Sequence, residues 1–249
     1  MKKLFVGVLC VALSLSVQGK EVNMTSPDGK YQFTLSDSGG QLHYSLTWNG
    51  KQTVKPSLLG INANVEWRDG VEIGTVDSSR KDTIWHPVYG ERSEIKDCYH
   101  AWKIVVNRQN GRDKLILDVR AYDEGIAFRY HFPGGQYLKI TDEYTEYTMP
   151  EGTKAYFTPK AQTPYSYLPL ENWPGESDRP LLLTLADGGY VCLAEAQVVD
   201  YVRTKFNVSP TKKNTIISAM YGPVEDIAPY STPWRVIMVG ERPVDLINN

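Results

Sequence analysis

Hydrophobic and polar residues alternate along much of this chain. Apolar side chains occupy every second position over 31–35, 42–48, 115–121 and 126–132. A period of two places one set of side chains on a buried face of a strand and the other set on the opposite face. The pairs that separate the runs supply the positive φ that tight hairpins need. These pairs are Gly39-Gly40, Asn49-Gly50, Asn110-Gly111, Gly134-Gly135 and Gly188-Gly189.

The rest of the chain continues the same theme. Residues 69–83 are polar and rich in Gly, Asp and Ser, which favours a surface loop, and only 242–249 has helical potential. Short strands with Gly and Pro turns and few helices predict an all-β protein, a large antiparallel sandwich in one domain. Further strands are predicted at 58–67, 99–107, 154–158, 181–186, 190–194, 198–208, 214–220 and 234–239.

The N-terminus has the pattern of an export signal. Lys2 and Lys3 precede an apolar run over 4–13, and small residues follow up to Gly19. This pattern predicts a signal peptide over 1–19 and an exported, periplasmic protein, and the run is too short to span a membrane. Two cysteines then remain, Cys98 and Cys192. Export permits a disulfide between them, but two buried free thiols are an equal alternative.

Charge and motifs exclude several functions. A formal net charge of -2 gives no electrostatic case for nucleic acid or acidic membranes. The sequence has no Gly-x-Ser-x-Gly elbow, phosphate loop or Cys-x-x-Cys pair, and its four histidines lack metal-ligand spacing. Glycoside hydrolysis needs two carboxyl groups that flank a sugar ring, and the sequence pairs no two of them.

One long segment, 159–180, does not look like a strand. Its five prolines forbid a regular ladder or helix, and structureless loops longer than about 12–15 residues are usually functional or disordered. Flat rings beside carboxylates and an amide suit a sugar, with or without a metal ion. The alternative is that the rings only hold the loop against the body of the protein. The residues concerned are Tyr165, Tyr167, Glu171, Asn172, Trp173 and Glu176.

Other charged residues point to structure. We expect Glu91, Arg92 and Glu94 to form an ion-paired corner at the edge of the sandwich, because ion-pair networks often serve structure alone. Asp123 precedes Glu124-Gly125 in a predicted turn. Glu195 follows a predicted strand, and we expect it to close a turn.

Several segments resemble the start of family 97 glycoside hydrolases. The loop over 162–176 is more similar to the retaining, α-galactosidase-type branch than to the inverting, α-glucosidase-type branch. One departure is Cys98-Tyr99-His100, where many members carry His-Tyr-Asn. The matching segments are 26–30, 44–51, 56–61, 89–95, 122–130 and 232–235.

The resemblance implies three domains in a complete enzyme: an N-terminal β-super-sandwich (galactose-mutarotase-like), a catalytic (β/α)₈ barrel and a small C-terminal β domain. This chain covers the first, with 20–241 as the sandwich and 242–249 as the start of a linker. The catalytic carboxylates of the family lie on the barrel, so no residue here inherits a catalytic role. The family also holds calcium, mostly by barrel glutamates. The resemblance makes Glu171 the first candidate for an added ligand, with Asn172 and Glu176 behind it.

The sequence therefore predicts the N-terminal domain of a secreted, calcium-dependent retaining α-glycosidase that acts on an α-galactoside or a related oligosaccharide. Its partner is the catalytic barrel of the same protein, and Tyr165, Tyr167, Asn172 and Trp173 are the candidate sugar contacts. A stand-alone carbohydrate-binding module is the alternative. An aldose-epimerase-like enzyme is a weaker one, because that chemistry needs a facing His and Glu.

Overall fold

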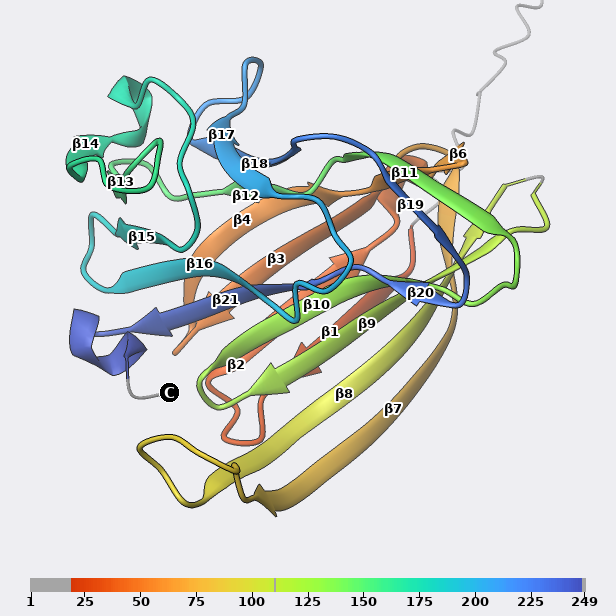
Figure 1. The fold of residues 1–249 in the computed structure, drawn as a ribbon, viewed down its shortest axis with the longest axis horizontal. Coiled ribbons are helices and arrows are strands. Elements are labelled where there is room, and N and C mark those ends of the chain that lie inside the picture. The colour runs from red at the N-terminus through yellow and green to blue at the C-terminus, as the bar shows by residue number, and fades with distance from the viewer. Residues whose placement is uncertain (1–18, 110, 248–249) are drawn as a thin grey trace, which may run out of the picture.

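A computed structural model describes residues 19–109 and 111–247 of the chain (Figure 1). The predicted signal peptide lies almost entirely outside the described residues. Within them, regular structure is nearly all strand, which confirms the all-β prediction. The helical elements among these residues are three short 3₁₀ segments: η1 (Ser38–Gly40), η2 (Leu170–Asn172) and η3 (Pro243–Leu246).

The first of three antiparallel sheets has seven strands and carries the N-terminal alternating runs. Its strands, in spatial order, are β1 (Glu21–Thr25), β2 (Tyr31–Ser36), β3 (Leu42–Trp48), β4 (Lys51–Leu59), β12 (Glu146–Thr148), β18 (Thr215–Met220) and β17 (Thr204–Val208).

The second sheet has ten strands, and a small third sheet has four. The ten-stranded sheet runs in the order β14 (Ser166–Pro169), β13 (Lys154–Phe157), β15 (Leu181–Thr184), β16 (Tyr190–Ala196), β21 (Trp234–Gly240), β10 (Gly125–Phe132), β9 (Lys114–Tyr122), β8 (Ile95–Arg108) and β7 (Val71–Trp85), with β20 (Tyr230–Ser231) beside β10. The four-stranded sheet is β19 (Val224–Ile227), β11 (Tyr137–Glu143), β5 (Ile61–Ala63) and β6 (Val65–Glu66).

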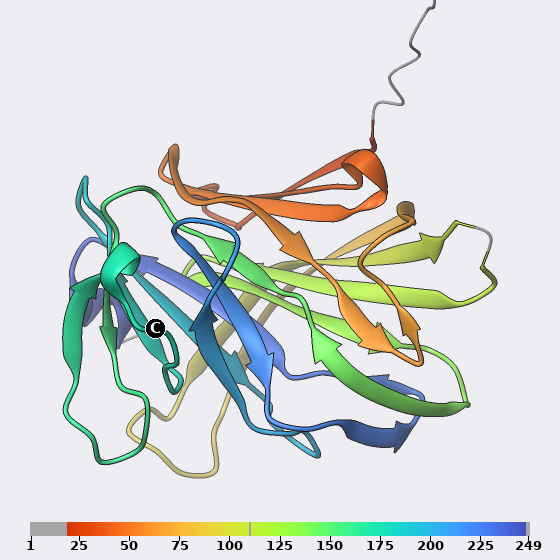
Figure 2. The ribbon, with the colours of Figure 1, turned by 90° about the horizontal axis from the view of Figure 1, so that it is seen from above.

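The core lies between the two large sheets, which face one another in Figure 2. The inward positions of the alternating runs meet there: Phe33 stacks on Tyr44 at 5.1 Å between ring centroids, and Tyr44 lies 5.4 Å from Phe128. Such aromatic pairs add about 0.5–1.5 kcal/mol each beyond the area they bury. Alternation therefore predicted the core face of β2, β3 and β10 correctly.

Three predictions about individual segments were wrong. Within the loop predicted over 69–83, residues 71–83 belong to β7, which pairs with β8. This edge strand is mostly exposed, so burial imposes no alternation on its sequence. Its charged side chains disfavour pairing of the open edge with a strand of another chain. Glu91, Arg92 and Glu94 lie exposed in the β7–β8 connection and form no ion pair with any described residue. Finally, β17 begins at Thr204, so 198–203 is a connection.

The buried hydroxyl of Tyr31 gives a test of the sheet-to-sheet contact. It donates to the carbonyl of Val239 and accepts from the amide of the same residue, both at 2.9 Å. Tyr31→Phe should lower the free energy of unfolding by about 1–3 kcal/mol, because these buried backbone groups lose their partner. Urea titration measures the change. The control is Tyr89→Phe, whose side chain is 90% exposed; equal losses in the two variants would contradict the contact.

Candidate functional site

The outer face of the ten-stranded sheet is concave. In Figure 2 the connections at its two ends, β13–β14 and β7–β8, bend to the same side, away from β1–β4. Across its middle, directly paired positions carry Ala194, Val236, Ala127, Arg120 and Ala101. Paired positions on neighbouring antiparallel strands share a face, so small side chains flank one arginine.

A cavity of about 700 Å³ opens on this face. The strands that form its floor are central in the sheet, so its shape is fixed by the ladder rather than by loops. Its lining mixes aromatic, aliphatic, basic and acidic side chains, among them Trp85, Asp97, Arg120, Glu124, Trp234 and Val236.

Cations and rings stack along one wall of the cavity. The guanidinium of Arg120 lies 4.6 Å from the ring of Trp234 and 4.7 Å from that of Tyr99. Arg129 lies 4.3 Å from the Trp234 ring, and its Nε donates to Asp118 at 3.0 Å. Cation–π contacts contribute about 0.5–2 kcal/mol. Trp234 is thus held rigidly between two arginines.

A buried ion network lies behind this wall, on the core side of the sheet. Arg235 on β21 forms an ion pair with Glu195, which lies directly opposite it on the neighbouring strand β16. The Nε of Arg235 also donates to Glu143 on β11 at 2.8 Å. The side chains of Arg235 and Glu143 are fully buried. Burial acts to raise the pKa of Glu143, but the charge and hydrogen bonds of Arg235 outweigh it and lower that pKa below its ordinary value.

Arg179 joins the end of the 159–180 loop to this network. Its Nε lies 3.0 Å from Glu195 and 2.8 Å from the hydroxyl of Thr204, and its Nη2 donates to Ser218 at 2.6 Å. Its guanidinium covers the ring of Phe206 at 3.8 Å. Burial, followed by the charge of Arg235, lowers the pKa of Arg179. The turn predicted for Glu195 was wrong. Glu195 lies within β16, where its carboxylate pairs with Arg235 and Arg179 in the core.

The prediction that 159–180 has no regular structure was wrong, because β14 within it pairs with β13 and η2 follows. The structure also separates the predicted aromatic contacts of this segment. Trp173 is only 4% exposed and packs on Phe157, so it holds the loop to the body and offers no face to solvent. Tyr165 is 66% exposed. Tyr167 stacks on Tyr156 at 4.1 Å. Register then links Tyr167 to the cavity face through a row of paired positions: Tyr156, Leu182, Cys192 and Met238.

The predicted metal ligands differ in their surroundings. Glu171 and Asn172 are exposed on η2, and Glu171 forms no ion pair with any described residue. Glu176 pairs with the buried ammonium of Lys205, which lowers the pKa of that carboxyl. Calcium takes six to eight oxygen ligands, and the described residues contain no group of three acidic, His or Cys side chains suited to a metal. Glu171 is thus an exposed carboxylate without an ion pair, and the described residues do not assemble a calcium site by themselves.

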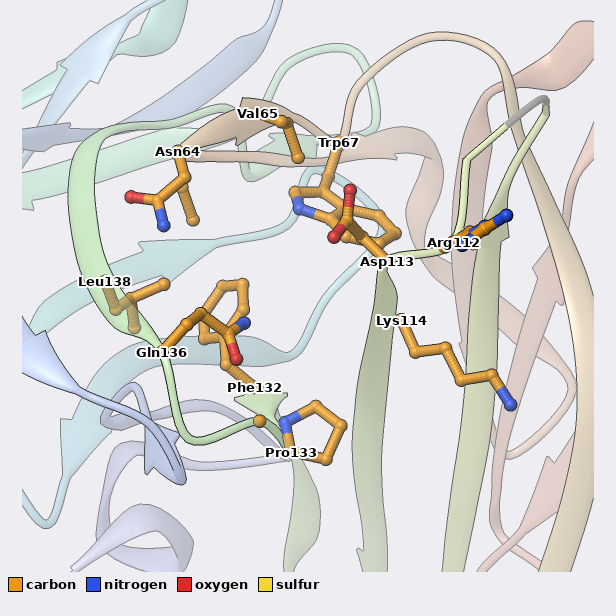
Figure 3. Close-up of a pocket in the computed structure, with 12 residues that line it drawn as sticks. Asn64, Val65, Trp67, Arg112, Asp113, Lys114, Phe132, Pro133, Gln136 and Leu138 are labelled. Carbon is orange, nitrogen blue, oxygen red and sulfur yellow. The ribbon is translucent and has the colours of Figure 1, made fainter.

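Two further features were not anticipated in detail. Cys98 and Cys192 are free thiols, and only Cys192 is buried. A second cavity, of about 480 Å³, lies at the β5–β6 end of the molecule (Figure 3). The side chain of Asn64 at this cavity forms two hydrogen bonds with the backbone. It donates to the carbonyl of Tyr137 and accepts from the amide of Lys139, both at 2.7 Å.

The fold defines a large antiparallel β-sandwich domain, and comparison with known proteins identifies its family. Residues 24–249 match the family described as "Glycosyl-hydrolase 97 N-terminal". The chain therefore belongs to glycoside hydrolase family 97, as its N-terminal domain, which confirms the resemblance seen in the sequence.

Relatives and solved structures agree with this assignment. A retaining alpha-galactosidase from Bacteroides thetaiotaomicron is 25% identical over 99% of this chain, which covers 38% of that protein. A family 97 enzyme from Pseudoalteromonas sp. strain K8, solved with panose, has a TM-score of 0.85 at 24% identity over 92% of this chain and 37% of its own. A beta-arabinopyranosidase shares the fold with a TM-score of 0.80 at 21% identity, over 88% and 40%. The chain thus spans about two-fifths of these proteins.

The structure also bears on two remaining expectations. Among the described residues, no helix has the length and apolar character needed to cross a membrane. Two carboxylates that the fold brings together, Glu143 and Glu195, are held by arginines in the interior. No signal in the local sequence pointed to this pairing, because its members lie on β11, β16 and β21.

The network predicts how stability responds to pH. The pKa of Glu143 is lower in the folded state than its ordinary value of 4.5, so its contribution is present above that value and is lost as pH falls through the folded pKa. Glu143→Gln should lower the unfolding free energy at pH 7 by about 3–5 kcal/mol, because Arg235 loses a buried partner. It should also flatten the dependence on pH below 4.5.

Urea titrations from pH 7 to pH 3 measure both effects. Glu225→Gln is the matched control, because it removes the exposed pair with Lys139 at 2.8 Å and should cost at most about 1 kcal/mol. Parallel pH profiles for the wild type and Glu143→Gln would contradict the pairing.

Proposed function

We propose that this chain is the N-terminal domain of an exported, calcium-dependent retaining α-glycosidase, an α-galactosidase. The observation that carries the proposal is the family match over residues 24–249 in a chain that covers only 38% of a relative described as a retaining alpha-galactosidase. The sandwich supports a catalytic barrel in the same protein and shapes the rim of its pocket. The leader over 1–19 supports export to the periplasm.

The chemistry of the described residues supports this division of labour. A retaining glycosidase needs two carboxyl groups about 5–5.5 Å apart on either side of the scissile bond, one of them able to exchange a proton. Glu143 and Glu195 are instead buried against Arg235 and Arg179. Their charges are neutralised, and no sugar reaches them. This supports our assignment of the acid/base and nucleophile roles to the barrel.

The loop over 159–180 is the part of this chain that we assign to the pocket rim. Tyr165 and Tyr167 present phenol rings to solvent, and Asn172 presents an amide. These groups suit the faces and hydroxyls of a sugar such as an α-galactoside. Trp173 anchors the loop from beneath, and Arg179 ties its end to the ion network.

Calcium, when bound, supplies a positive charge that orients oxygen groups at the reaction centre. Glu171 is the residue of this chain that we propose as a ligand, because its carboxylate is exposed and carries no ion pair within the described chain. Glu176 is a weaker candidate, since binding a metal there requires Lys205 to release it.

The proposal predicts that the chain alone does not hydrolyse a chromogenic α-galactoside, because it lacks a paired acid and nucleophile. In the longer protein, Glu171→Gln should weaken calcium affinity about tenfold or more, as loss of one charged ligand does. Calorimetric titration of the chelated protein with calcium measures this. Glu151→Gln, an exposed acidic residue before β13, is the control. Turnover by the isolated chain at enzyme-like rates, or equal calcium affinity in both variants, would overturn the proposal.

A stand-alone carbohydrate-binding module is the second candidate, and the exposed stack of Tyr156 and Tyr167 is the observation that favours it. Rings that stack on a sugar contribute through their faces. The isolated chain should then bind galactosides saturably in calorimetry, and Tyr165→Ala or Tyr167→Ala should weaken binding. No heat at millimolar sugar removes this candidate and leaves the first one standing.

A further inference from the structure

Arg120 is a guanidinium without an acidic partner in the described chain. It is half-buried on β9, stacked between the rings of Tyr99 and Trp234, and it lines the 700 Å³ cavity. Its one side-chain hydrogen bond, from Nη1 to the hydroxyl of Tyr122, is long at 3.4 Å. Arg129 stacks on the same Trp234 ring but is paired with Asp118. Since a guanidinium carries five N–H donors in a rigid fork, Arg120 offers unused donors to the cavity.

The floor beside Arg120 is apolar, while other parts of the lining carry Arg92, Lys96, Glu124 and Asp97, which pairs with Lys81. Ala127, Val236 and Met238 lie beside it on β10 and β21, and Ile95 closes the side toward β8. Aliphatic surface around a fixed aromatic and an arginine is the composition that dominates binding energy at protein interfaces. The cavity therefore suits a protein surface that brings both apolar side chains and an acceptor for Arg120.

Exposed large apolar side chains lie at the cavity and on nearby connections. Trp85, which lines the cavity at the end of β7, is 57% exposed. On the β7–β8 connection that follows it, Val88 is 98% exposed and Tyr89 90%. On the β16–β17 connection, Val198 is 52% exposed and Val199 63%. Both connections extend to the same side as the concave face in Figure 2. Exposed apolar groups gathered around a hollow mark an interaction site.

The location of the described C-terminal end indicates which partner occupies the cavity. η3 packs against the end of β21, the strand that supplies Trp234, Val236 and Met238. In Figures 1 and 2 the described C-terminal end lies at the same end of the molecule as the β7–β8 connection. The family 97 relatives continue well beyond the part that this chain matches, since it covers 37–40% of the solved chains. A polypeptide that continues from η3 therefore starts at the end of the strand that carries the cavity wall.

We propose that this concave face is the seat of the catalytic domain and that Arg120 is its anchor, binding a carboxylate or backbone carbonyl of that domain. The proposal rests on the proposed function for the existence of that domain. It goes further by naming the face, the anchor and the chemistry of the group that Arg120 meets. The end of β7 and the β7–β8 connection then contact the docked domain through Trp85 and the residues that follow it.

The test uses two polypeptides: this chain, and the polypeptide encoded directly downstream of Asn249 expressed separately. Their affinity is measured by calorimetry, and hydrolysis of a chromogenic α-galactoside is measured on the mixture. Arg120→Gln and Trp85→Ala should each weaken binding about tenfold or more. Trp85 is exposed, so its removal leaves the fold of the chain intact. Arg112→Gln at the second cavity (Figure 3) is the matched control and should change affinity less than about twofold.

Each outcome decides between the two proposals. Tight binding unaffected by Arg120→Gln and Trp85→Ala, or no binding, overturns the docking face. Hydrolysis by the mixture, with binding insensitive to both variants, supports the proposed function and overturns the docking face. Binding sensitive to both variants, with no hydrolysis of the galactoside, supports the docking face and contradicts the proposed activity. Self-association of this chain alone that Arg120→Gln abolishes assigns the face to a second copy and overturns the proposal.

Discussion

The buried pairing of Arg235 with Glu143 and Glu195 is the interaction on which the rest of the structure depends. Arg235 and Glu195 belong to the ten-stranded sheet and Glu143 to the four-stranded sheet. Arg179 extends the network to Thr204 and Ser218 of the seven-stranded sheet. Charges in the interior are stable only when each is paired and hydrogen-bonded. One network therefore fixes how the three sheets and the loop meet.

This arrangement gives β21 two different faces. Residues at odd positions, including Arg235, point into the core, while Trp234, Val236 and Met238 point to the concave face. The network thus fixes from behind the strand that carries the cavity wall. The loop over 159–180 is held in the same way, by Trp173 at its middle and Arg179 at its end. A surface positioned by buried charges suits a domain that must hold a neighbour in a defined place.

The sequence predicted those strands in which burial of one face produces an alternation of apolar and polar residues. The alternating runs around Phe33, Tyr44 and Phe128 predicted β2, β3 and β10 and their core faces, because one face of each strand packs in the core. The edge strand β7 escaped prediction because neither side of its outer half is buried. Glu195 was misread because its partner Arg235 lies 40 residues away in the chain. Among the loop aromatics, composition alone does not distinguish Trp173, which anchors, from Tyr165, which is exposed.

Native-state hydrogen exchange of the chain carrying Arg235→Met tests the central claim most directly, because it reports stability segment by segment. The account predicts that amides of β16, β17 and the 159–180 loop lose protection together, while β2 and β3 stay protected. Protection that is unchanged across these segments, or that falls equally throughout the chain, would contradict a network that ties the loop and the cavity wall to the core.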